Sequence, residues 1–538
     1  MPQPVISVSK MADEKGWRES QSKDRIDRLQ SGQFFTPLPV SQFLANWLSS
    51  KGLNQSEIRL LDPGAGGGVL TAAVVDRICK LRNEGKLGKI RKVSLHAYEH
   101  DSDLIPVLTR TLRECVAGVS EVGINSEFVI SSENYIEGAV EALSPDLFET
   151  SETAPFTHAI LNPPYRKLNS QSADRARMSS IGIETSNLYA AFAWLAFRQL
   201  DEGGELVAIT PRSFCNGPYF REFRKEILED GEFRRVHVFD ARNEAFGRDQ
   251  VLQENILFHL RKPRKSRSSF VSVSTGSIES PRTARVPVGD FVSPQDSDRV
   301  IHIAPEKDAM EVRAFFYDLP NRLEDLGVAV STGPVVDFRL RKHLHHEVDD
   351  SSVALIYPHC VRAGRVSPPR PKAEDYSDSR ISKKAVAIEV GAETEKWLVE
   401  TKRFVLIKRF SSKEEKRRLV AGVLEPADFQ SNRVGIENHL NFLHRNRCGL
   451  PKDLALGLCR FLNSTIADQF FRQFNGHTQV NASDLRMFRF PGREQLQELG
   501  EATVDDSDQQ SIDRAMSEIL RAPIWRRHYE DSAENELE

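Results

Sequence analysis

The chain has 538 residues, a length that predicts more than one folded domain. With 39% hydrophobic and 28% charged residues it has the composition of a soluble globular protein, and it lacks the run of about 18 apolar residues that a membrane span requires. The net charge of −4 does not by itself suggest a polyanionic partner. Two basic segments, 261–267 and 402–418, keep nucleic acid open as a partner, although each also fits a solvated helix face or a charged linker.

The six cysteines are scattered along the chain without a C-x-x-C pair. This spacing argues against a zinc site or a disulfide framework, so we expect no metal and a reducing, cytoplasmic environment. The polar residues 1–28 are expected to form a loose extension, and they lack the apolar stretch of a secretory signal.

The segment that follows residue 28 predicts an α/β domain with a mostly parallel, twisted sheet, because short apolar runs alternate with amphipathic stretches. The expected strands are 58–62, 94–99, 127–130, 158–161, 205–210, 235–239 and 255–260. The expected helices are 68–80, 104–117, 188–200 and 219–228, with 80–92 as an inserted polar loop. The stretch 261–300, rich in Ser, Arg and Pro, is expected to be a linker or a β-hairpin, and the domain is placed at 29–304.

A second, mixed α/β domain is expected at 305–492, with strands at 353–357 and 404–408 and a helix at 454–464. Basic and aromatic residues interleave at 404–410, 470–474 and 486–490. This pattern suits contact with bases and phosphates, and it also suits a hydrophobic core with arginines at its edge. Residues 493–538 are expected to form an acidic tail.

A glycine-rich run, 64–68, follows the first expected strand and precedes a helix. Such a turn lets bare backbone approach a nucleotide-like ligand, although it could also be a turn that binds nothing. The run lacks the Gly-Lys-Ser/Thr of a P-loop and the strict G-x-G-x-x-G spacing, which disfavours ATP and NAD. Glu99, at the end of the next expected strand, can accept hydrogen bonds from both ribose hydroxyls.

Asn162-Pro163-Pro164-Tyr165 follows the apolar run 159–161 and places an amide, a backbone carbonyl and an aromatic ring at the mouth of a strand. An exocyclic amine on a heteroaromatic ring is a poor nucleophile, because its lone pair is delocalised into the ring. Two acceptors for its hydrogens favour tetrahedral nitrogen, and a neighbouring ring can stack on the base. The motif predicts methyl transfer to a planar amino group, although alone it also fits a strand-to-turn junction.

Several motifs in one order resemble the gamma class of S-adenosylmethionine-dependent DNA amino-methyltransferases, chiefly the N6-adenine enzymes of bacterial restriction–modification systems. The resemblance covers roughly residues 30–490. In the first domain it lies in 32–37, 62–68, Glu99, 162–165, 204–211 and Phe246 ahead of 253–257. In the second domain the segments 331–333, 435–439 and 475–481 are similar to sequences of the target-recognition half.

The resemblance implies a Rossmann-like catalytic domain followed by a target-recognition domain, and it implies roles for individual residues. Thr36 and Pro37 would line the methionine end of S-adenosylmethionine, and Glu99 would bind its ribose. The remaining implied cofactor residues are Asp62, Gly64, Gly66, Asn134 and Asn162. The family usually has Asp where Asn134 stands, so the contact to the adenine amino group is left to Asn134 or Glu133.

For catalysis, the resemblance implies that Asn162 and Pro163 accept the hydrogens of the target amine and that Tyr165 and Phe246 stack on a base flipped out of the duplex. The implied activity is sequence-specific N6-adenine methylation of double-stranded DNA, which would protect host DNA from a separate cognate restriction endonuclease. We expect a modification-only enzyme that acts as a monomer.

Three alternatives stay open: an N4-cytosine DNA methyltransferase, a methyltransferase for RNA or protein glutamine, and an inactive DNA-recognition scaffold. A cytosine C5 mechanism would need a cysteine nucleophile. Cys215 has no proline before it, and we expect it to be a buried structural thiol.

Overall fold

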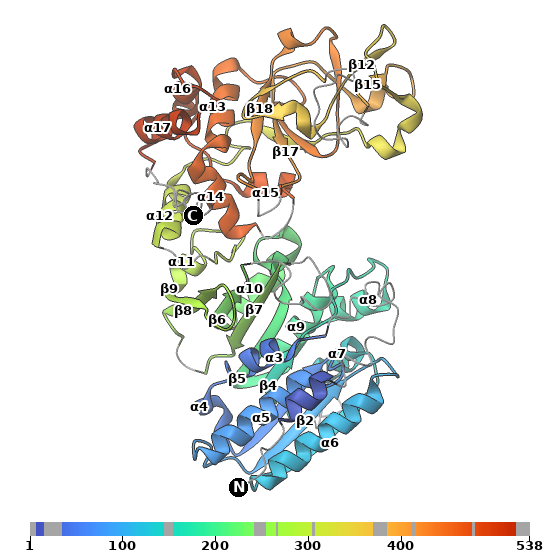
Figure 1. Ribbon diagram of the computed structural model, residues 1–538, viewed down its shortest axis with the longest axis vertical. Coiled ribbons are helices and arrows are strands. Elements are labelled where there is room, and N and C mark those ends of the chain that lie inside the picture. Colours follow the sequence, from blue (N-terminus) through green and yellow to red (C-terminus); the bar gives the residue numbers. More distant parts are fainter. Residues whose placement is uncertain are drawn as a thin grey trace, which may run out of the picture. The chain divides into compact units, whose positions relative to one another are not determined.

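The computed structural model describes residues 7–14, 35–144, 154–240, 254–264, 267–303, 307–369, 385–411, 415–475 and 479–522. The chain forms two compact units, Met1–Pro305 and Glu306–Glu538 (Figure 1). Within the described ranges, no helix combines the length and the apolar content that crossing a membrane would require.

The first unit is built on a nine-stranded sheet with the order β3-β2-β1-β4-β5-β7-β6-β8-β9. Strands β1 to β5 are parallel, and β7 lies antiparallel between β5 and β6. The strands are β1 (Glu57–Pro63), β2 (Lys92–Tyr98), β3 (Asn125–Ser131), β4 (Phe156–Leu161), β5 (Leu200–Pro211), β6 (Glu232–Val238), β7 (Asn255–Arg261), β8 (Phe270–Thr275) and β9 (Arg282–Pro287). The predicted Rossmann-like fold is confirmed, and the stretch 261–300 supplies the antiparallel hairpin β8–β9.

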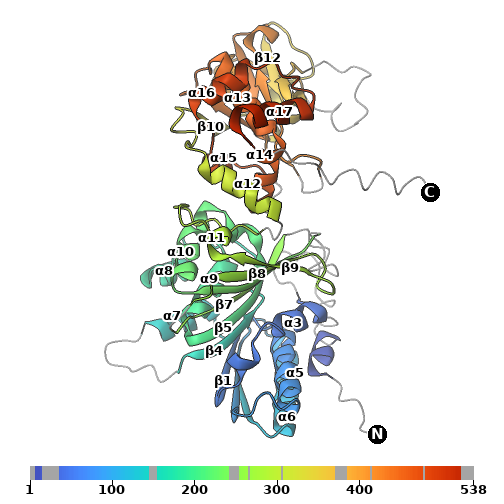
Figure 2. The ribbon, with the colours of Figure 1, turned by 90° about the vertical axis from the view of Figure 1, so that its left-hand side faces the viewer.

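Helices cover both faces of this sheet, and each face has its own hydrophobic core (Figure 2). One face carries α3 (Leu38–Ala45), α5 (Val69–Asn83) and α6 (Ile105–Glu121). The other carries α7 (Tyr135–Leu143), α8 (Ala173–Ser180), α9 (Leu188–Arg198) and α10 (Arg221–Glu229). Helix α9 is apolar on all sides, and every residue from Leu188 to Phe197 is buried, as expected for a helix enclosed by its neighbours. Two short helices, α4 (Ser50–Leu53) and α11 (Val288–Phe291), complete the unit.

The predicted polar loop at 80–92 is shorter than expected, because α5 continues to Asn83. The turn that follows is not a loose insertion. Leu87 and Ile90 are fully buried, and the backbone amide of Arg91 donates to the carbonyl of Ser56 at 2.8 Å. These contacts fix the start of β2 beside β1.

The order of the strands creates a crevice at one edge of the sheet. The chain runs from β1 outward to β2 and β3, then returns to β4 on the other side of β1. At such a reversal the carboxyl ends of the neighbouring strands part and leave room for a ligand. The glycine-rich loop follows β1 and the Asn162–Tyr165 motif follows β4, so the fold brings both motifs to this edge.

The second unit contains a six-stranded sheet, β10-β20-β17-β18-β14-β13, and a five-stranded sheet, β11-β15-β12-β19-β16. Its strands are β10 (Ala329–Thr332), β11 (Leu344–His345), β12 (Ser352–Ile356), β13 (Val361–Arg362), β14 (Gly364–Val366), β15 (Ala387–Glu389), β16 (Leu398–Glu400), β17 (Phe404–Lys408), β18 (Ala421–Leu424), β19 (Arg433–Ile436) and β20 (Leu440–His444). Its helices are α12 (Lys307–Asp318), α13 (Lys452–Asn463), α14 (Thr465–Phe474), α15 (Ala482–Met487), α16 (Arg493–Glu501) and α17 (Gln509–Leu520). Both predicted strands and the predicted helix of this unit are present as β12, β17 and α13.

Most phenylalanines of the aromatic–basic segments form the core of the second unit. Phe316 stacks on Phe470 with ring centroids 4.1 Å apart, and Phe461, Phe488 and Phe490 are buried around them. For these residues the core interpretation of the pattern is correct. Phe410 differs, because 43% of it is exposed.

The described part of 493–538 does not form a separate tail. Helix α16 packs on α13 so closely that a Cβ atom at Gly457 would overlap the backbone of Leu496, and one at Gly500 would overlap the backbone of Asp453. The side chain of Arg460 donates to Leu499 O at 2.7 Å and to Ala502 O at 2.9 Å. Helices α16 and α17 therefore belong to the second unit.

Candidate active site

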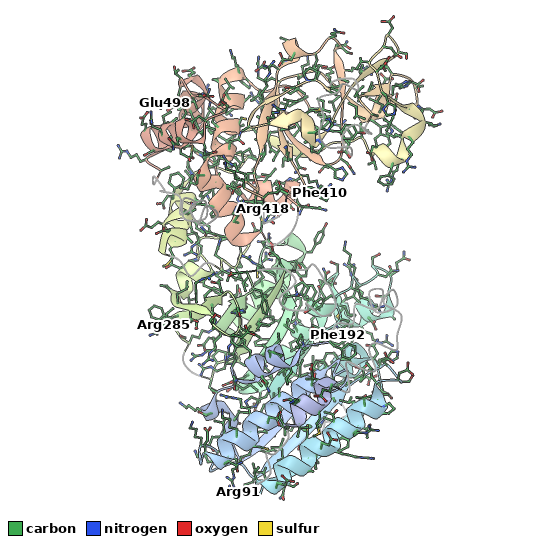
Figure 3. The ribbon with its side chains drawn as sticks, viewed as in Figure 1. Arg91, Phe192, Arg285, Phe410, Arg418 and Glu498 are labelled. Carbon is green, nitrogen blue, oxygen red and sulfur yellow. The ribbon has the colours of Figure 1, made fainter. Side chains whose placement is uncertain are left out.

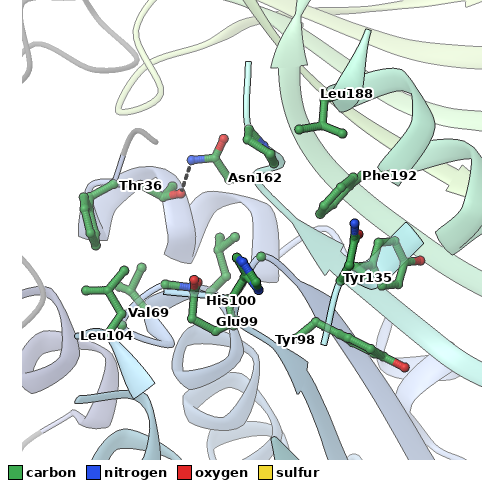
Figure 4. A pocket seen from close by; sticks show the side chains of 18 of the residues that line it. Thr36, Val69, Tyr98, Glu99, His100, Leu104, Tyr135, Asn162, Leu188 and Phe192 are labelled. Carbon is green, nitrogen blue, oxygen red and sulfur yellow. Dashed lines mark hydrogen bonds between the residues drawn. The ribbon is translucent and has the colours of Figure 1, made fainter. Parts of the chain in front are cut away.

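A cavity of about 370 Å³ lies at the carboxyl ends of β1, β2 and β4 (Figure 4). Its volume is within the range of small-molecule and cofactor pockets. The wall includes six of the predicted cofactor residues: Thr36, Gly64, Gly66, Glu99, Asn134 and Asn162. The fold therefore assembles at one place residues that are up to 126 positions apart in the chain.

The glycine-rich loop is fixed to the end of β2 by backbone hydrogen bonds. The amides of Gly64 and Ala65 both donate to Tyr98 O at 2.9 Å. Gly64 and Gly66 have φ angles of 77° and 55°, a region that side chains rarely allow. A side chain at either position would also reduce the space in the cavity.

Glu99 is held in the cavity wall by two backbone amides. Its Oε2 accepts from Gly66 N at 2.7 Å and its Oε1 accepts from Asp101 N at 2.8 Å. Burial raises the pKa of this carboxyl group, and the two amides oppose that shift. A carboxylate fixed in this way can still accept hydrogen bonds from a diol, since each oxygen has further lone pairs.

Asp62 lies below the glycine-rich loop and not on the cavity wall. It is 1% exposed, and its Oδ2 accepts from Thr71 Oγ1 at 2.7 Å. Burial raises the pKa of Asp62 to about 7, with the neighbouring Glu99 adding a smaller contribution in the same direction. The structure thus places Asp62 where it supports the loop, and its predicted contact with the cofactor stays a prediction.

The side chain of Asn162 donates from Nδ2 to Thr36 Oγ1 at 3.0 Å (Figure 4). Thr36 is buried just ahead of α3, whose N-cap is Pro37. Pro37 itself is not part of the cavity wall. This bond fixes the orientation of the Asn162 amide, whose oxygen is an acceptor and whose nitrogen is a donor.

The rest of the motif is anchored to the neighbouring strand. Pro163 is buried, and Pro164 lines the cavity. The hydroxyl of Tyr165 donates to Ile209 O on β5 at 3.2 Å, and its ring lies edge-on to Tyr189 with centroids 6.4 Å apart. Burial raises the pKa of Tyr165 far above its ordinary value. Tyr165 is therefore held beside the cavity without belonging to its wall.

Three groups of predicted residues cannot be placed. Phe246, the predicted second stacking ring, and residues 32–34 of the first motif lie outside the described residues. The same holds for Gln253.

The predicted contact of Asn134 with the cofactor's adenine stays a prediction, and the Asn134 amide already makes two hydrogen bonds in the structure. Asn134 caps α7, with its Oδ1 accepting from Ile136 N at 3.0 Å. Its Nδ2 donates to Asp174 Oδ1 at 2.8 Å, and Asp174 lines the cavity from the first turn of α8. Asp174 was missed because α8 has no apolar periodicity, and its only sequence signal is the N-cap Ser172, which accepts from Arg175 N.

An aromatic group close to Asn134 was also missed. Tyr135 contacts Tyr98 and Phe192 with ring centroids 5.0 Å and 4.9 Å away, and all three line the cavity. In Figure 4 the Tyr135–Phe192 pair is drawn to the right of the Thr36–Asn162 pair, and Glu99 is drawn below the latter. Phe192 could not be recognised because it lies in the uniformly apolar α9. The aromatic end of the cavity suits a planar heteroaromatic ring.

Two further expectations concern a metal site and the thiol of Cys215. Among the described residues, no group of three or more His, Cys, Asp or Glu side chains is placed to hold a metal ion. Cys215 is fully buried, and burial raises the pKa of its thiol to about 12. Cys215 is thus the structural thiol that was expected, since a thiolate is not available at that pKa.

Comparisons with known proteins decide the family. A model of Eco57I restriction-modification methylases matches residues 83–246. The type II methyltransferase M.BsuBI of Bacillus subtilis is 40% identical over 503 residues, which covers 92% of this chain and 95% of that protein. The chain belongs to the type II restriction–modification methyltransferases. A second member, M.PstI of Providencia stuartii, is 38% identical over 520 residues, covering 96% of this chain and 98% of that protein.

Among solved structures, the type IIG restriction endonuclease BpuSI matches 96% of this chain and 68% of its own, with 12% identity and a TM-score of 0.43. The methyltransferase family gives the activity, methyl transfer to DNA, and the cofactor, S-adenosylmethionine. The cavity fits that cofactor, because it offers an anchored carboxylate for a diol, an aromatic end for a heterocycle and glycine backbone where a side chain would intrude.

Proposed function

We propose that this methyltransferase modifies N6 of adenine at a specific DNA sequence. The observation that carries the proposal is the place of Asn162 in the cavity wall, where the hydrogen bond from its Nδ2 to Thr36 Oγ1 orients the amide. Asparagine at this position favours adenine, because N4-cytosine enzymes of the resembling class more often have serine or aspartate there. Methylation of cytosine N4 remains the second candidate, since the two amines share their chemistry.

In the proposed mechanism, Asn162 Oδ1 and the carbonyl of Pro163 accept the two hydrogens of the amine. This frees the nitrogen lone pair from the ring and directs it into the cavity. Bound S-adenosylmethionine supplies a methyl group that is already activated on a sulfonium, so the residues act mainly by positioning and by electrostatics. The Tyr165 hydroxyl bonds to Ile209 O on β5, and this support favours packing of the half-buried Tyr165 ring against the extruded base.

Extrusion of the base from the duplex costs a few kcal/mol. Stacking on an aromatic side chain returns roughly 1–3 kcal/mol per base. Tyr165, with Phe246 as the second ring, is proposed to supply this contact. Transfer of the proton released by the amine follows methylation, and it goes to solvent or to a neighbouring acceptor.

For the cofactor, Glu99 is proposed to bind the ribose, and Asp174 is proposed to accept a hydrogen bond from the adenine amino group. Asp174 Oδ1 already takes a hydrogen from Asn134 Nδ2, which orients the carboxylate at the cavity wall. The family usually has Asp after the third strand; here Asn134 stands at that place with Glu133 beside it, and both line the cavity together with Asp174. Of the two carboxylates, Asp174 is the one that accepts a hydrogen bond from Asn134, and we propose it for the adenine amino group. Tyr135 and Phe192 lie at the same end of the cavity and would pack on the ring.

The identity of the modified base tests the proposal. Duplex DNA is incubated with the purified enzyme and S-adenosylmethionine that carries a deuterated methyl group, then digested to nucleosides for mass spectrometry. We expect the label in N6-methyladenine. Label found only in N4-methylcytosine would replace the proposal with its second candidate.

We infer further that the enzyme is monomeric and cytoplasmic and that it protects host DNA from a separate cognate endonuclease. Its membership in a restriction–modification family supports the pairing with an endonuclease. DNA from cells that express the chain should resist cleavage by an endonuclease of the same recognition sequence. Cleavage at every modified site would contradict the protective role.

A further inference from the structure

Three segments of the second unit that the sequence singles out, 331–333, 435–439 and the described residues of 475–481 (475 and 479–481), meet at one place. Gly333 N donates to Leu440 O at 2.8 Å, and a Cβ at Gly333 would overlap the backbone of Glu437. Asn441 Nδ2 donates to Val480 O at 2.7 Å, while its Oδ1 accepts from Thr332 Oγ1 at 3.1 Å. Buried contacts therefore tie the end of β10, the β19–β20 turn and the segment before α15 to each other.

An exposed cluster lies at this junction, and we call it the Phe410 surface. It consists of Arg409, Phe410, His439 and Gln479. Phe410 pairs with Gln479 in an isolated antiparallel bridge, and its ring centroid lies 4.6 Å from that of His439. The guanidinium of Arg409 is 5.9 Å from the Phe410 ring centroid. Phe410 is labelled in Figure 3 and is 43% exposed, whereas the phenylalanines of the core are buried.

His439 is oriented by a buried carboxylate. Glu437 accepts from His439 Nδ1 through Oε1 and from the His439 backbone amide through Oε2, the latter at 2.9 Å. The Glu437 side chain is 0% exposed, while that of His439 is 41% exposed. Because Nδ1 of His439 bonds to Glu437, Nε2 is the ring nitrogen left for a partner, and no described residue bonds to it. Nε2 accepts when an imidazole is neutral and donates when it is protonated.

Gln479 is oriented by Arg409. Its Oε1 accepts from Arg409 at 3.2 Å, and Arg409 also donates to Asn438 O at 3.2 Å. The amide oxygen is thus engaged, and no described residue accepts from Nε2, which carries two hydrogens. The Phe410 surface therefore presents the Gln479 amide as a donor, the Nε2 atom of His439 and an apolar ring, each fixed by contacts behind it.

Burying the Glu437 carboxylate is costly unless it holds a partner, and the partner it holds is an exposed histidine. Buried side chains that orient donors and acceptors on the surface are typical of a recognition site. Base edges in the major groove of DNA present matching donor and acceptor patterns.

We propose that the Phe410 surface reads base edges of the target duplex, with Gln479 donating, His439 forming a hydrogen bond through Nε2 and Phe410 packing against a base. This inference rests on the proposed function, in that the second unit recognises the target sequence. Within that unit, Phe410, His439 and Gln479 would contact the bases. An alternative role in binding phosphates without sequence preference is distinguished by the test.

The test uses the full chain and three variants. Phe410→Ala removes the ring, and Gln479→Glu replaces the amide donor by an acceptor while leaving an oxygen for Arg409. His439 is left unchanged, because its removal would leave Glu437 buried without its partner. Phe270→Ala is the matched control, since Phe270 is 40% exposed on β8 and has the Arg285 guanidinium 4.7 Å from its ring.

The recognition sequence is first obtained by sequencing modified DNA from cells that express the wild-type chain. Affinity is then measured for a duplex with that sequence and for a scrambled duplex. We expect Phe410→Ala and Gln479→Glu each to reduce the ratio of the two affinities roughly ten- to hundred-fold, the range for one lost base contact. The control should keep the wild-type ratio, and all variants should bind S-adenosylhomocysteine in the first unit as the wild type does.

Two results would overturn the inference. One is a wild-type affinity ratio in both variants, and the other is equal weakening on both duplexes, which indicates phosphate contact only. A variant that unfolds is identified by its thermal transition, and the other variant then decides. If the wild-type product is N4-methylcytosine, the adenine proposal fails while the affinity ratios still test the Phe410 surface.

Discussion

The hydrogen bond between Asn162 and Thr36 decides which atom of the amide is offered to the amine. We predict that Thr36→Val lowers kcat roughly two- to ten-fold, the effect of one net hydrogen bond, because the amide loses the acceptor that orients it. Thr36→Ser keeps the hydroxyl and should restore most of the rate. Pre-steady-state methyl transfer to duplex DNA measures the effect, and a Val variant as fast as the wild type would show that the bond does not matter.

Asp174 gives a prediction about cofactor recognition. Asp174→Asn should weaken binding of S-adenosylhomocysteine roughly ten-fold or more, since a hydrogen bond to a charged acceptor is lost. The same variant should gain relative affinity for S-inosylhomocysteine, whose ring carries a carbonyl where adenine carries the amino group. Isothermal titration calorimetry reports both affinities without any need for DNA.

The control for Asp174 is Glu137→Gln. Glu137 joins α7 to α8 through an ion pair with Arg177 at 2.6 Å, but it is not part of the cavity wall. The Glu137→Gln variant should bind S-adenosylhomocysteine and S-inosylhomocysteine with the affinities of the wild type. An unchanged ratio of the two affinities in Asp174→Asn would remove Asp174 from the adenine end.

The buried Asp62 predicts a pH dependence of stability. Burial raises the pKa of its carboxyl from 3.8 to about 7, so the folded state keeps a proton that the unfolded state has already lost. The protonated Asp62 therefore contributes to the free energy of unfolding at low pH, and this contribution is lost as the pH rises towards 7. Asp62→Asn, which imitates the protonated group, should gain stability relative to the wild type by about 3 kcal/mol between about pH 5 and about pH 8. Urea unfolding at both pH values measures the difference in unfolding free energy between the variant and the wild type. The same difference at both pH values would contradict the raised pKa of Asp62.

At the scale of the elements, the sequence predicts strands better than it predicts the cavity. The seven predicted strands of the first unit are present because each combines apolar residues with a turn signal at its end. Helix α8 was missed because only Met178 of its eight residues is buried, so no apolar face exists to recognise. Because α8 could not be predicted, Asp174 could not be recognised as a cavity residue. Phe192 could not be recognised either, because α9 is uniformly apolar.

The second unit shows a different limit. The segments around Phe404, Phe410 and Phe488 have the same alternation of basic and aromatic residues, yet only Phe410 among them is exposed. Local sequence cannot separate the two outcomes, because burial depends on packing partners distant in the chain. Phe316, for example, contacts Phe461, Phe470 and Phe488.

The close packing of α13 on α16 gives a prediction for stability. Gly457→Ala should destabilise the protein by roughly 1–3 kcal/mol, because the new methyl group would overlap the backbone of Leu496. Gly391→Ala is the control, since nothing lies within 4 Å of a Cβ there. Chemical denaturation of both variants provides the comparison, and equal stability would mean that the two helices can separate at no cost.

At the scale of the whole molecule, each unit presents polar groups that its own hydrophobic core orients. In the first unit, the reversal of strand order at β1 and β4 brings the cofactor loop and the Asn162 motif to one cavity. In the second, the buried Glu437 and the β10–β20 contacts orient the Phe410 surface. A net charge of −4 for the chain does not oppose a DNA substrate, because recognition depends on these local surfaces.

The most direct measurement compares single-turnover methyl transfer by Asn162→Ala and Asn169→Ala. Asn169 is exposed in the same segment after β4 and is not part of the cavity wall, so its variant is the matched control. We predict that Asn162→Ala loses at least roughly 100-fold in rate, as when a preorganised polar group is removed from an active site, while its affinity for S-adenosylhomocysteine stays close to that of the wild type. A wild-type rate in Asn162→Ala would contradict the assignment of the amide as the acceptor for the target amine.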